Sequence, residues 1–94
     1  MPERMHFEFV PSDDDPLLGY IETNLQLAES EQPEYYASMA EADEGSFVAQ
    51  VLAGIVGVRA LSIEQSRVIL WREEDADWES VVAQAIMALR EEFL

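Results

Sequence analysis

The chain has 94 residues, of which 49% are hydrophobic, and twenty Asp and Glu against five Arg give it a net charge of −15 at pH 7. This length fits one small domain with a single core, and the apolar content excludes a disordered acidic tail. The negative charge disfavours nucleic acid and anionic membranes as partners, because both are bound through basic side chains. The chain contains no cysteine, so it cannot by itself ligate an iron–sulfur cluster or a metal through thiolates.

The ends of the chain and its longest apolar stretch bear on where the protein resides. The first residues lack the basic-then-apolar order of a signal peptide. The stretch Phe47–Val58 is interrupted by two glycines and falls short of the roughly 20 apolar residues that span a bilayer. We therefore expect a cytoplasmic protein without a membrane partner.

The acidic composition has three interpretations. All five basic residues are Arg and there is no Lys, a balance that favours adaptation to a salty cytoplasm, where acidic side chains keep the surface hydrated. The same surface could instead dock a basic partner or mimic a polyanion, or it could collect metal ions. We favour the halophilic interpretation.

The N-terminal half predicts two antiparallel strands. Met5–Val10 alternates apolar and polar residues in the manner of a half-buried strand. Pro11–Pro16 ends it, because proline removes a backbone donor and Asp and Ser favour turns. Tyr20–Ala28 alternates more weakly and predicts the second strand, and Glu29–Glu34 is expected to be a polar connector.

The middle of the chain predicts a short helix or helical turn followed by a second helix. Ser38 and Glu41 have the spacing of a capping box. Ser46 is a better N-cap and precedes one apolar helical stripe. Gly57 stands where a left-handed C-terminal cap would be needed, and a close helix–sheet approach would explain Gly54. The stripe consists of Phe47, Val48, Val51, Leu52, Ile55 and Val56.

The C-terminal part predicts a hairpin and a closing helix. Val58–Glu64 and Arg67–Glu73 read as strands, and Val68–Trp71 is apolar on both faces, which indicates a central strand covered on both sides. Acidic residues up to Asp77 suit the start of the last helix. Its apolar stripe consists of Trp78, Val81, Val82, Ala85, Ile86, Leu89 and Phe93. The elements together predict an α+β fold: a two-layer sandwich with an antiparallel or mixed four-stranded sheet and two main helices packed on one face.

No residue pattern predicts catalysis or a bound cofactor. The single histidine, His6, has no second ligand or nucleophile beside it. Asp13–Asp15 carries carboxylates that suit a hard cation but lacks the glycine and distant Glu of a calcium loop, so we interpret it as a solvated turn. We expect no enzyme and no catalytic, metal or cofactor-binding residue in this chain alone.

The stretch from Ala37 to Phe93 resembles a known module. It combines Ser46–Ala49 at a helix start, Leu52–Val58 at the helix end, the apolar strand Arg67–Arg72 and the pair Asp77-Trp78 before the last helix. In this layout it is similar to the N-terminal domain of Nfu-type (NifU-like) iron–sulfur cluster scaffold proteins. The turn Pro11–Pro16 keeps prolines and turn residues but departs from the Thr-Pro-Asn-Pro-like turn of that family.

The resemblance implies a single Nfu N-terminal-like domain over residues 1–94 and a non-enzymatic accessory function in iron–sulfur cluster assembly or delivery. In that family a separate domain with a Cys-x-x-Cys motif holds the cluster, and such a scaffold domain would be the protein partner. The alternative is a free-standing acidic binding protein for an unrelated, basic partner. The expected partner contacts are Pro11, Ser12, Asp13, Asp14, Asp15, Pro16, Gln65 and Ser66.

Overall fold

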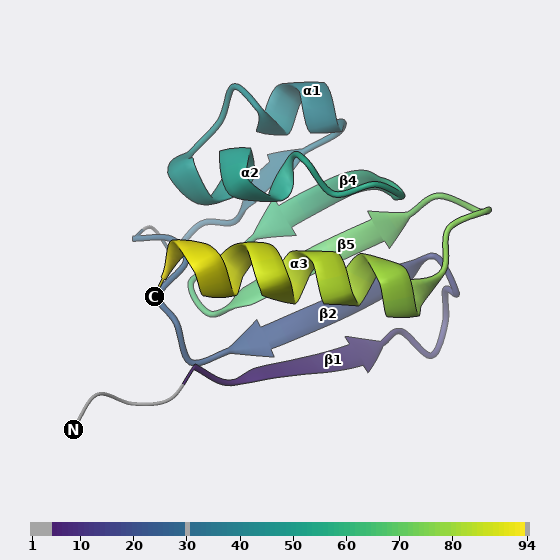
Figure 1. Cartoon of the computed structure of the whole chain (residues 1–94). Coiled ribbons are helices and arrows are strands. Elements are labelled where there is room, and N and C mark those ends of the chain that lie inside the picture. The colour runs from purple at the N-terminus through teal and green to yellow at the C-terminus, as the bar shows by residue number, and fades with distance from the viewer. Residues whose placement is uncertain (1–4, 30, 94) are drawn as a thin grey trace.

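A computed structural model describes residues 5–29 and 31–93 of the chain. Five strands and three helices follow one another along it, and Figure 1 shows their arrangement. The elements are β1 (Phe7–Pro11), β2 (Leu18–Thr23), β3 (Glu34–Tyr36), α1 (Met39–Ala42), α2 (Phe47–Leu52), β4 (Val58–Ile63), β5 (Arg67–Arg72) and α3 (Trp78–Glu92).

The strands form one sheet in the order β1-β2-β5-β4-β3, and all neighbours are antiparallel. The predicted α+β class and antiparallel sheet are confirmed, but the prediction of four strands is wrong. The fifth strand, β3, has only three residues and directly follows Pro33. Three residues are too few to show an alternating pattern, and the proline makes the segment read as a connector.

The predicted second strand is misplaced at both ends. β2 begins at Leu18 and ends at Thr23. Beyond it the chain turns across the end of the β4–β5 hairpin, where the Leu27 amide donates to the Gln65 carbonyl at 2.7 Å. Leu27 is nevertheless buried. It is apolar because it packs in the core, and its spacing from Leu25 only resembles the alternation of a strand.

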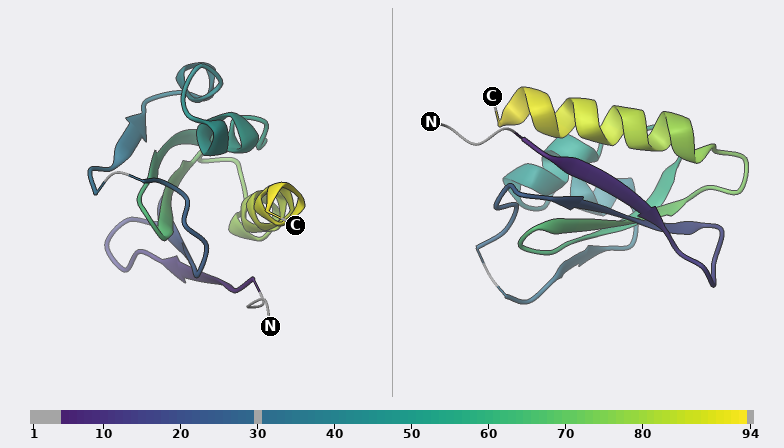
Figure 2. Two further views of the ribbon diagram at one scale, coloured as in Figure 1. Left: turned by 90° about the vertical axis from the view of Figure 1, so that its left-hand side faces the viewer. Right: turned by 90° about the horizontal axis from the view of Figure 1, so that it is seen from below.

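The core lies between the sheet and the helices. Phe9, Ile21, Val68 and Ile63 are aligned across four neighbouring strands, and the last three have no exposed surface. Figure 2 shows α2 and α3 on one side of the sheet. On α3 the buried side chains recur every four residues, as one helical stripe requires, and they are Val81, Ala85 and Leu89.

The helix starts follow the predicted capping residues. The Ser38 hydroxyl accepts from the Glu41 amide at 3.2 Å, and the Ser46 hydroxyl accepts from the Ala49 amide at 3.3 Å. Asp77 caps α3 by accepting from two backbone amides. Each cap satisfies donors that a helix cannot pair internally.

The end of α2 differs from the prediction. The helix stops at Leu52, and Ala53 is its right-handed C-cap. Gly57 does have a positive φ of 97°, but it lies five residues beyond Leu52, at the entry to β4. A Cβ on Gly54 would have no neighbour within 4 Å, so no close approach explains that glycine. Two residues of the predicted stripe are mainly exposed: Phe47 (62%) and Val56 (77%).

β5 is central in the sheet, as predicted, yet the expectation of a cover on both sides is wrong. Val68 and Leu70 face the helices and have no exposed surface, while Ile69 and Trp71 face the other way and are half-buried. No helix of the described residues lies over that second face (Figures 1 and 2). An apolar sequence on both sides of a strand therefore does not mean that both sides are covered.

Candidate functional site

The loop between β1 and β2 contains five of the eight predicted contact residues, and a sixth, Pro11, is the last residue of β1. The loop is closed by hydrogen bonds of its own. The Ser12 hydroxyl accepts from the Asp14 and Asp15 amides at 3.2 and 3.3 Å. The Asp15 carboxylate accepts from the Leu17 amide at 2.9 Å. Side-chain bonds of this type replace strand pairing in turns, so the segment has a defined conformation.

The same loop is attached to the rest of the fold through Trp78, the first residue of α3. The indole Nε1–H of Trp78 donates to the Pro16 carbonyl at 3.0 Å. The ring of Trp78 lies 5.0 Å from the ring of Phe9, with a 43° angle between the planes. The Arg72 amide also donates to the Leu17 carbonyl at 2.8 Å. The core therefore positions the loop.

Within the segment Pro11–Pro16 the side chains divide into two groups. Ser12 and Asp15, which close the loop, are half-buried, whereas four residues face solvent. The exposed residues are Pro11, Asp13, Asp14 and Pro16.

The other two predicted contacts, Gln65 and Ser66, form the tip of the β4–β5 hairpin. Their side chains are exposed, but the Ser66 carbonyl accepts from the Thr23 amide at 3.0 Å and the Gln65 carbonyl accepts from the Leu27 amide. The Gln65 side chain also donates through Nε2 to the Glu29 carbonyl at 3.5 Å, so the Ser66 side chain and the remaining polar groups of Gln65 are left for a partner.

The hairpin tip borders an open, acidic hollow of about 400 Å³. Its one basic member, Arg67, forms an ion pair with Glu64 at 2.6 Å. The hydrogen bond to Glu64 is the main cause that raises the pKa of Arg67. The hollow is lined by Glu22, Glu31, Glu64, Gln65, Ser66 and Arg67.

The structure places the two predicted contact segments at opposite ends of the sheet. Gly19, next to the β1–β2 loop, pairs with Leu70, whereas Glu22 pairs with Arg67 beside the hairpin tip. β2 and β5 have six residues each, so strands of this length separate the two ends by about 20 Å. A single small contact cannot include both segments.

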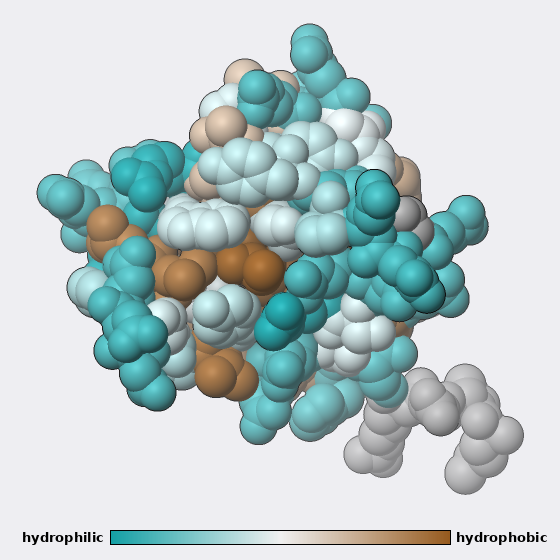
Figure 3. Space-filling model, turned by 180° about the vertical axis from the view of Figure 1, so that it is seen from behind, coloured by the Kyte–Doolittle hydropathy of each residue, from teal (hydrophilic) through white to brown (hydrophobic). Residues whose placement is uncertain are grey.

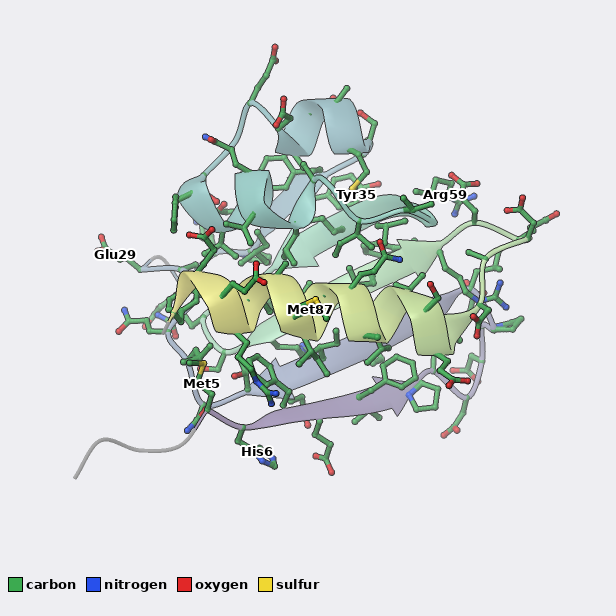
Figure 4. All side chains as sticks on the ribbon, in the orientation of Figure 1. Met5, His6, Glu29, Tyr35, Arg59 and Met87 are labelled. Carbon is green, nitrogen blue, oxygen red and sulfur yellow. The ribbon has the colours of Figure 1, made fainter. Side chains whose placement is uncertain are left out.

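The described residues show no arrangement for metal binding and no membrane-spanning helix. In residues 5–29 and 31–93 no three His, Cys, Asp or Glu residues are grouped to hold a metal ion. His6 extends away from the sheet at the β1 end (Figure 4). No helix in these ranges is both long and apolar enough to cross a bilayer.

The sheet face opposite the helices carries a surface that the sequence analysis did not identify. Strand alternation and register put six apolar or aromatic side chains on it, and we call them the open-face patch. Figure 3 shows this side with apolar and aromatic surface surrounded by hydrophilic residues. The open-face patch consists of Val10, Leu18, Tyr20, Tyr35, Ile69 and Trp71.

Two aromatic rings meet in the part of the open-face patch that is nearest to the β3 edge of the sheet. Tyr35 on β3 and Trp71 on β5 meet edge to face with ring centroids 5.7 Å apart, reaching over the intervening β4. β4 presents only small side chains there, Ala60 and Ser62, and both are 5% exposed. The small residues beneath the rings therefore let them meet, and the rings shield the strand from water.

Comparisons with known proteins support the fold. The chain matches no protein-family model and no curated protein. Its structure is similar to the crystal structure of protein SAV1430 from Staphylococcus aureus, with a TM-score of 0.72 and 14% sequence identity. The match covers 93% of this chain and 99% of that chain. At this identity the likeness establishes a shared α+β fold and nothing about activity.

Proposed function

We propose that this chain is a non-enzymatic accessory domain that binds a protein of iron–sulfur cluster assembly or delivery, and that it works in a salty cytoplasm. The partner is a scaffold domain with a Cys-x-x-Cys motif, which supplies the thiolates that this chain lacks. The proposal combines the sequence resemblance of residues 37–93 with the geometry of the β1–β2 loop.

The observation that carries the proposal is that hydrogen bonds close the β1–β2 loop and anchor it to the rest of the fold. Ser12 and Asp15 close the loop, and the Trp78 indole holds it against the start of α3. A loop that is already ordered loses little conformational freedom on binding, which preserves the free energy of its contacts. Asp13 and Asp14 are left exposed at its tip, where they can meet a complementary surface.

The loop is the main contact in this proposal, and the hairpin tip is a second one. Because about 20 Å separates the two ends of the sheet, a partner must span the whole sheet to touch both Asp13 and Gln65. A smaller partner contacts one end only, and the ordered loop is then the favoured end.

An amide NMR titration with the scaffold domain tests the proposal. The labelled protein is kept in molar KCl, and the scaffold domain is added first without and then with its cluster. Binding should shift the amides of residues 11–18, with or without those of residues 64–67. The Asp13→Asn, Asp14→Asn double variant should weaken binding about fivefold or more, because it removes carboxylates that accept charge-assisted hydrogen bonds at the contact, and direct contacts of this kind are screened little by salt.

The matched control removes two charges elsewhere. Asp43 and Glu44 follow α1 and are both exposed, so the Asp43→Asn, Glu44→Gln variant keeps the same net charge as the loop variant. It should bind within about twofold of the unmodified protein. No shift with either form of the scaffold domain would reject the iron–sulfur partner and leave the alternative, an acidic binding protein for an unrelated partner.

A further inference from the structure

We infer that the open-face patch docks a basic protein segment that presents apolar anchor side chains between lysines and arginines. The inference rests on the proposed function as an interaction domain but does not require the iron–sulfur partner. It concerns the sheet face opposite α2 and α3, whereas the β1–β2 loop lies at one end of the sheet.

The first observation is the composition and extent of the patch. Tyr35 is 61% exposed and Val10 is 39% exposed, while Tyr20, Ile69 and Trp71 are half-buried. Tyrosine and tryptophan are enriched at the centres of protein interfaces. The residues come from four strands with β4 between them, so the patch crosses the five-stranded sheet, a width of about 19 Å. A helix of about 13 residues has this length.

The second observation is the charge at the hairpin end of the patch. Arg67 lies over the Tyr20 ring, 5.2 Å from its centroid, and its charge is offset by the ion pair with Glu64. Glu22 and Glu31 line the same hollow. Glu8 pairs with Glu22 across β1 and β2. Acidic groups therefore border the apolar surface at this end.

The opposite end of the sheet is acidic as well. Five exposed acids outnumber one exposed base there: Asp13 and Asp14 on the β1–β2 loop and Glu73, Glu74 and Asp75 in the β5–α3 connection, against Arg59 at the start of β4. An apolar strip between two acidic ends is complementary to a segment with an apolar centre and basic ends.

The charge also decides between a basic partner and a second copy of the chain. Two copies stacked through this face would bring two surfaces of the same sign together, each molecule having a net charge of −15. Like charges that face each other disfavour association, and exposed apolar area favours it. A basic segment with apolar anchors can bury the apolar area and also pair with the acidic side chains, so it is the occupant we assign.

The experiment uses three synthetic 14-residue peptides as probes, at the lowest KCl concentration at which the protein is folded. The first has leucines at helical i, i+3, i+4 and i+7 spacing and lysines elsewhere. The second has the same composition in scrambled order, and the third has glutamates in place of the lysines. Binding of the first peptide should shift the amides of all five strands, and it should be at least about tenfold tighter than that of the other two.

Variants of exposed side chains connect the binding to the open-face patch without threatening the core. Tyr35→Ser combined with Val10→Ser should weaken binding of the first peptide about tenfold. Met87→Ser is the matched control, because Met87 is 62% exposed on α3, on the helix side of the sheet (Figure 4). This control should change the dissociation constant by less than about twofold.

Three outcomes would overturn the inference. Equal binding of the ordered and scrambled peptides means attraction to the acidic surface in general. An equal effect of Met87→Ser means that the patch is not the binding surface. Sedimentation that shows a dimer, together with shifts at Tyr35 and Trp71 on raising the protein concentration, means that a second copy covers the patch. None of these outcomes affects the scaffold titration, whose shifts are expected in residues 11–18.

Discussion

Replacement of Gly19 by alanine tests how the β1–β2 end of the fold is packed. Gly19 lies in β2 on the helix side, between Pro11 and Leu70 of the neighbouring strands. A Cβ there would stand 2.6 Å from Cε1 of Phe9 and 3.0 Å from Cη2 of Trp78. The first distance is about 0.8 Å short of ordinary van der Waals contact at 3.4 Å.

The neighbouring rings cannot easily move away. Phe9 packs against Trp78, and Trp78 is hydrogen bonded to Pro16, so a shift of the Phe9 ring disturbs the loop anchor as well. Overpacking of this kind costs about 1–3 kcal/mol, and the lower entropy of the unfolded alanine variant returns about 0.4–1 kcal/mol. We expect Gly19→Ala to lower the free energy of unfolding by about 1–2 kcal/mol.

Gly54→Ala is the matched control, with the same chemical change in open space. No heavy atom lies within 4 Å of its Cβ position, and its φ is outside the left-handed region. It should stabilise the protein by about 0.4–1 kcal/mol. In a domain of this size 1 kcal/mol shifts Tm by about 4–8 °C, so circular dichroism melts in molar KCl separate the two variants. Equal melting temperatures for both would refute the packing described around Phe9 and Trp78.

Three further predictions concern the loop anchor, the backbone at Gly57 and the net charge. Trp78→Phe removes the hydrogen bond to Pro16 and should lower the free energy of unfolding by about 1 kcal/mol, with faster amide exchange at Leu17. Trp78→Ala should lower it by about 3 kcal/mol. An alanine variant that melts at the same temperature as the unmodified protein would contradict the packing of this helix face. Gly57→Ala should lower the free energy of unfolding in urea by about 1–2 kcal/mol, because φ of Gly57 is +97° and a Cβ there would lie 2.8 Å from the Cβ of Ala76. An unchanged free energy of unfolding would place Gly57 in another conformation. The melting temperature of the unmodified protein should rise from low salt to molar KCl as repulsion among the twenty acids is screened; a flat response removes the halophilic interpretation.

The sequence predicted the elements whose pattern is local. β4, β5 and α3 agree with the structure to within about a residue at each end, since each has a local pattern over at least six residues: a strand-type run in β4 and β5 and helical periodicity in α3. β3 could not be found in this way, because its three residues owe their strand conformation to pairing with Leu61, Ser62 and Ile63 of β4. That pairing is set by tertiary structure, which local propensity does not contain.

The surfaces were less predictable than the elements, for a related reason. The predicted turn Pro11–Pro16 forms a loop from Ser12 onward, whereas Pro11 still pairs with Gly19 as part of β1. The anchor of this loop, the bond from Trp78 to Pro16, joins residues 62 positions apart. The separation of this loop from Gln65 follows from the pairing of β2 with β5, which is likewise non-local. The open-face patch is not evident from the sequence, because Ile69 and Trp71 are residue types that are also common in buried strands. Only the positions of the helices distinguish the two faces of the sheet.

The acidic surface and the open-face patch have to be explained together. A sheet with one uncovered apolar face and free edge strands tends to associate with copies of itself. A net charge of −15 opposes that association for every pair of copies, and Glu8 and Glu22 place part of the charge on the uncovered face itself. The repulsion between copies becomes attraction when the partner is basic, so the same charge keeps the free protein apart from its copies and favours the basic segment that we propose.

Screening by salt weakens both effects, whereas burial of Tyr35 and Trp71 does not depend on it. Peptide binding that weakens with KCl to a finite limit is therefore expected from an apolar contact bordered by charge, and binding that vanishes with KCl would identify a purely electrostatic surface.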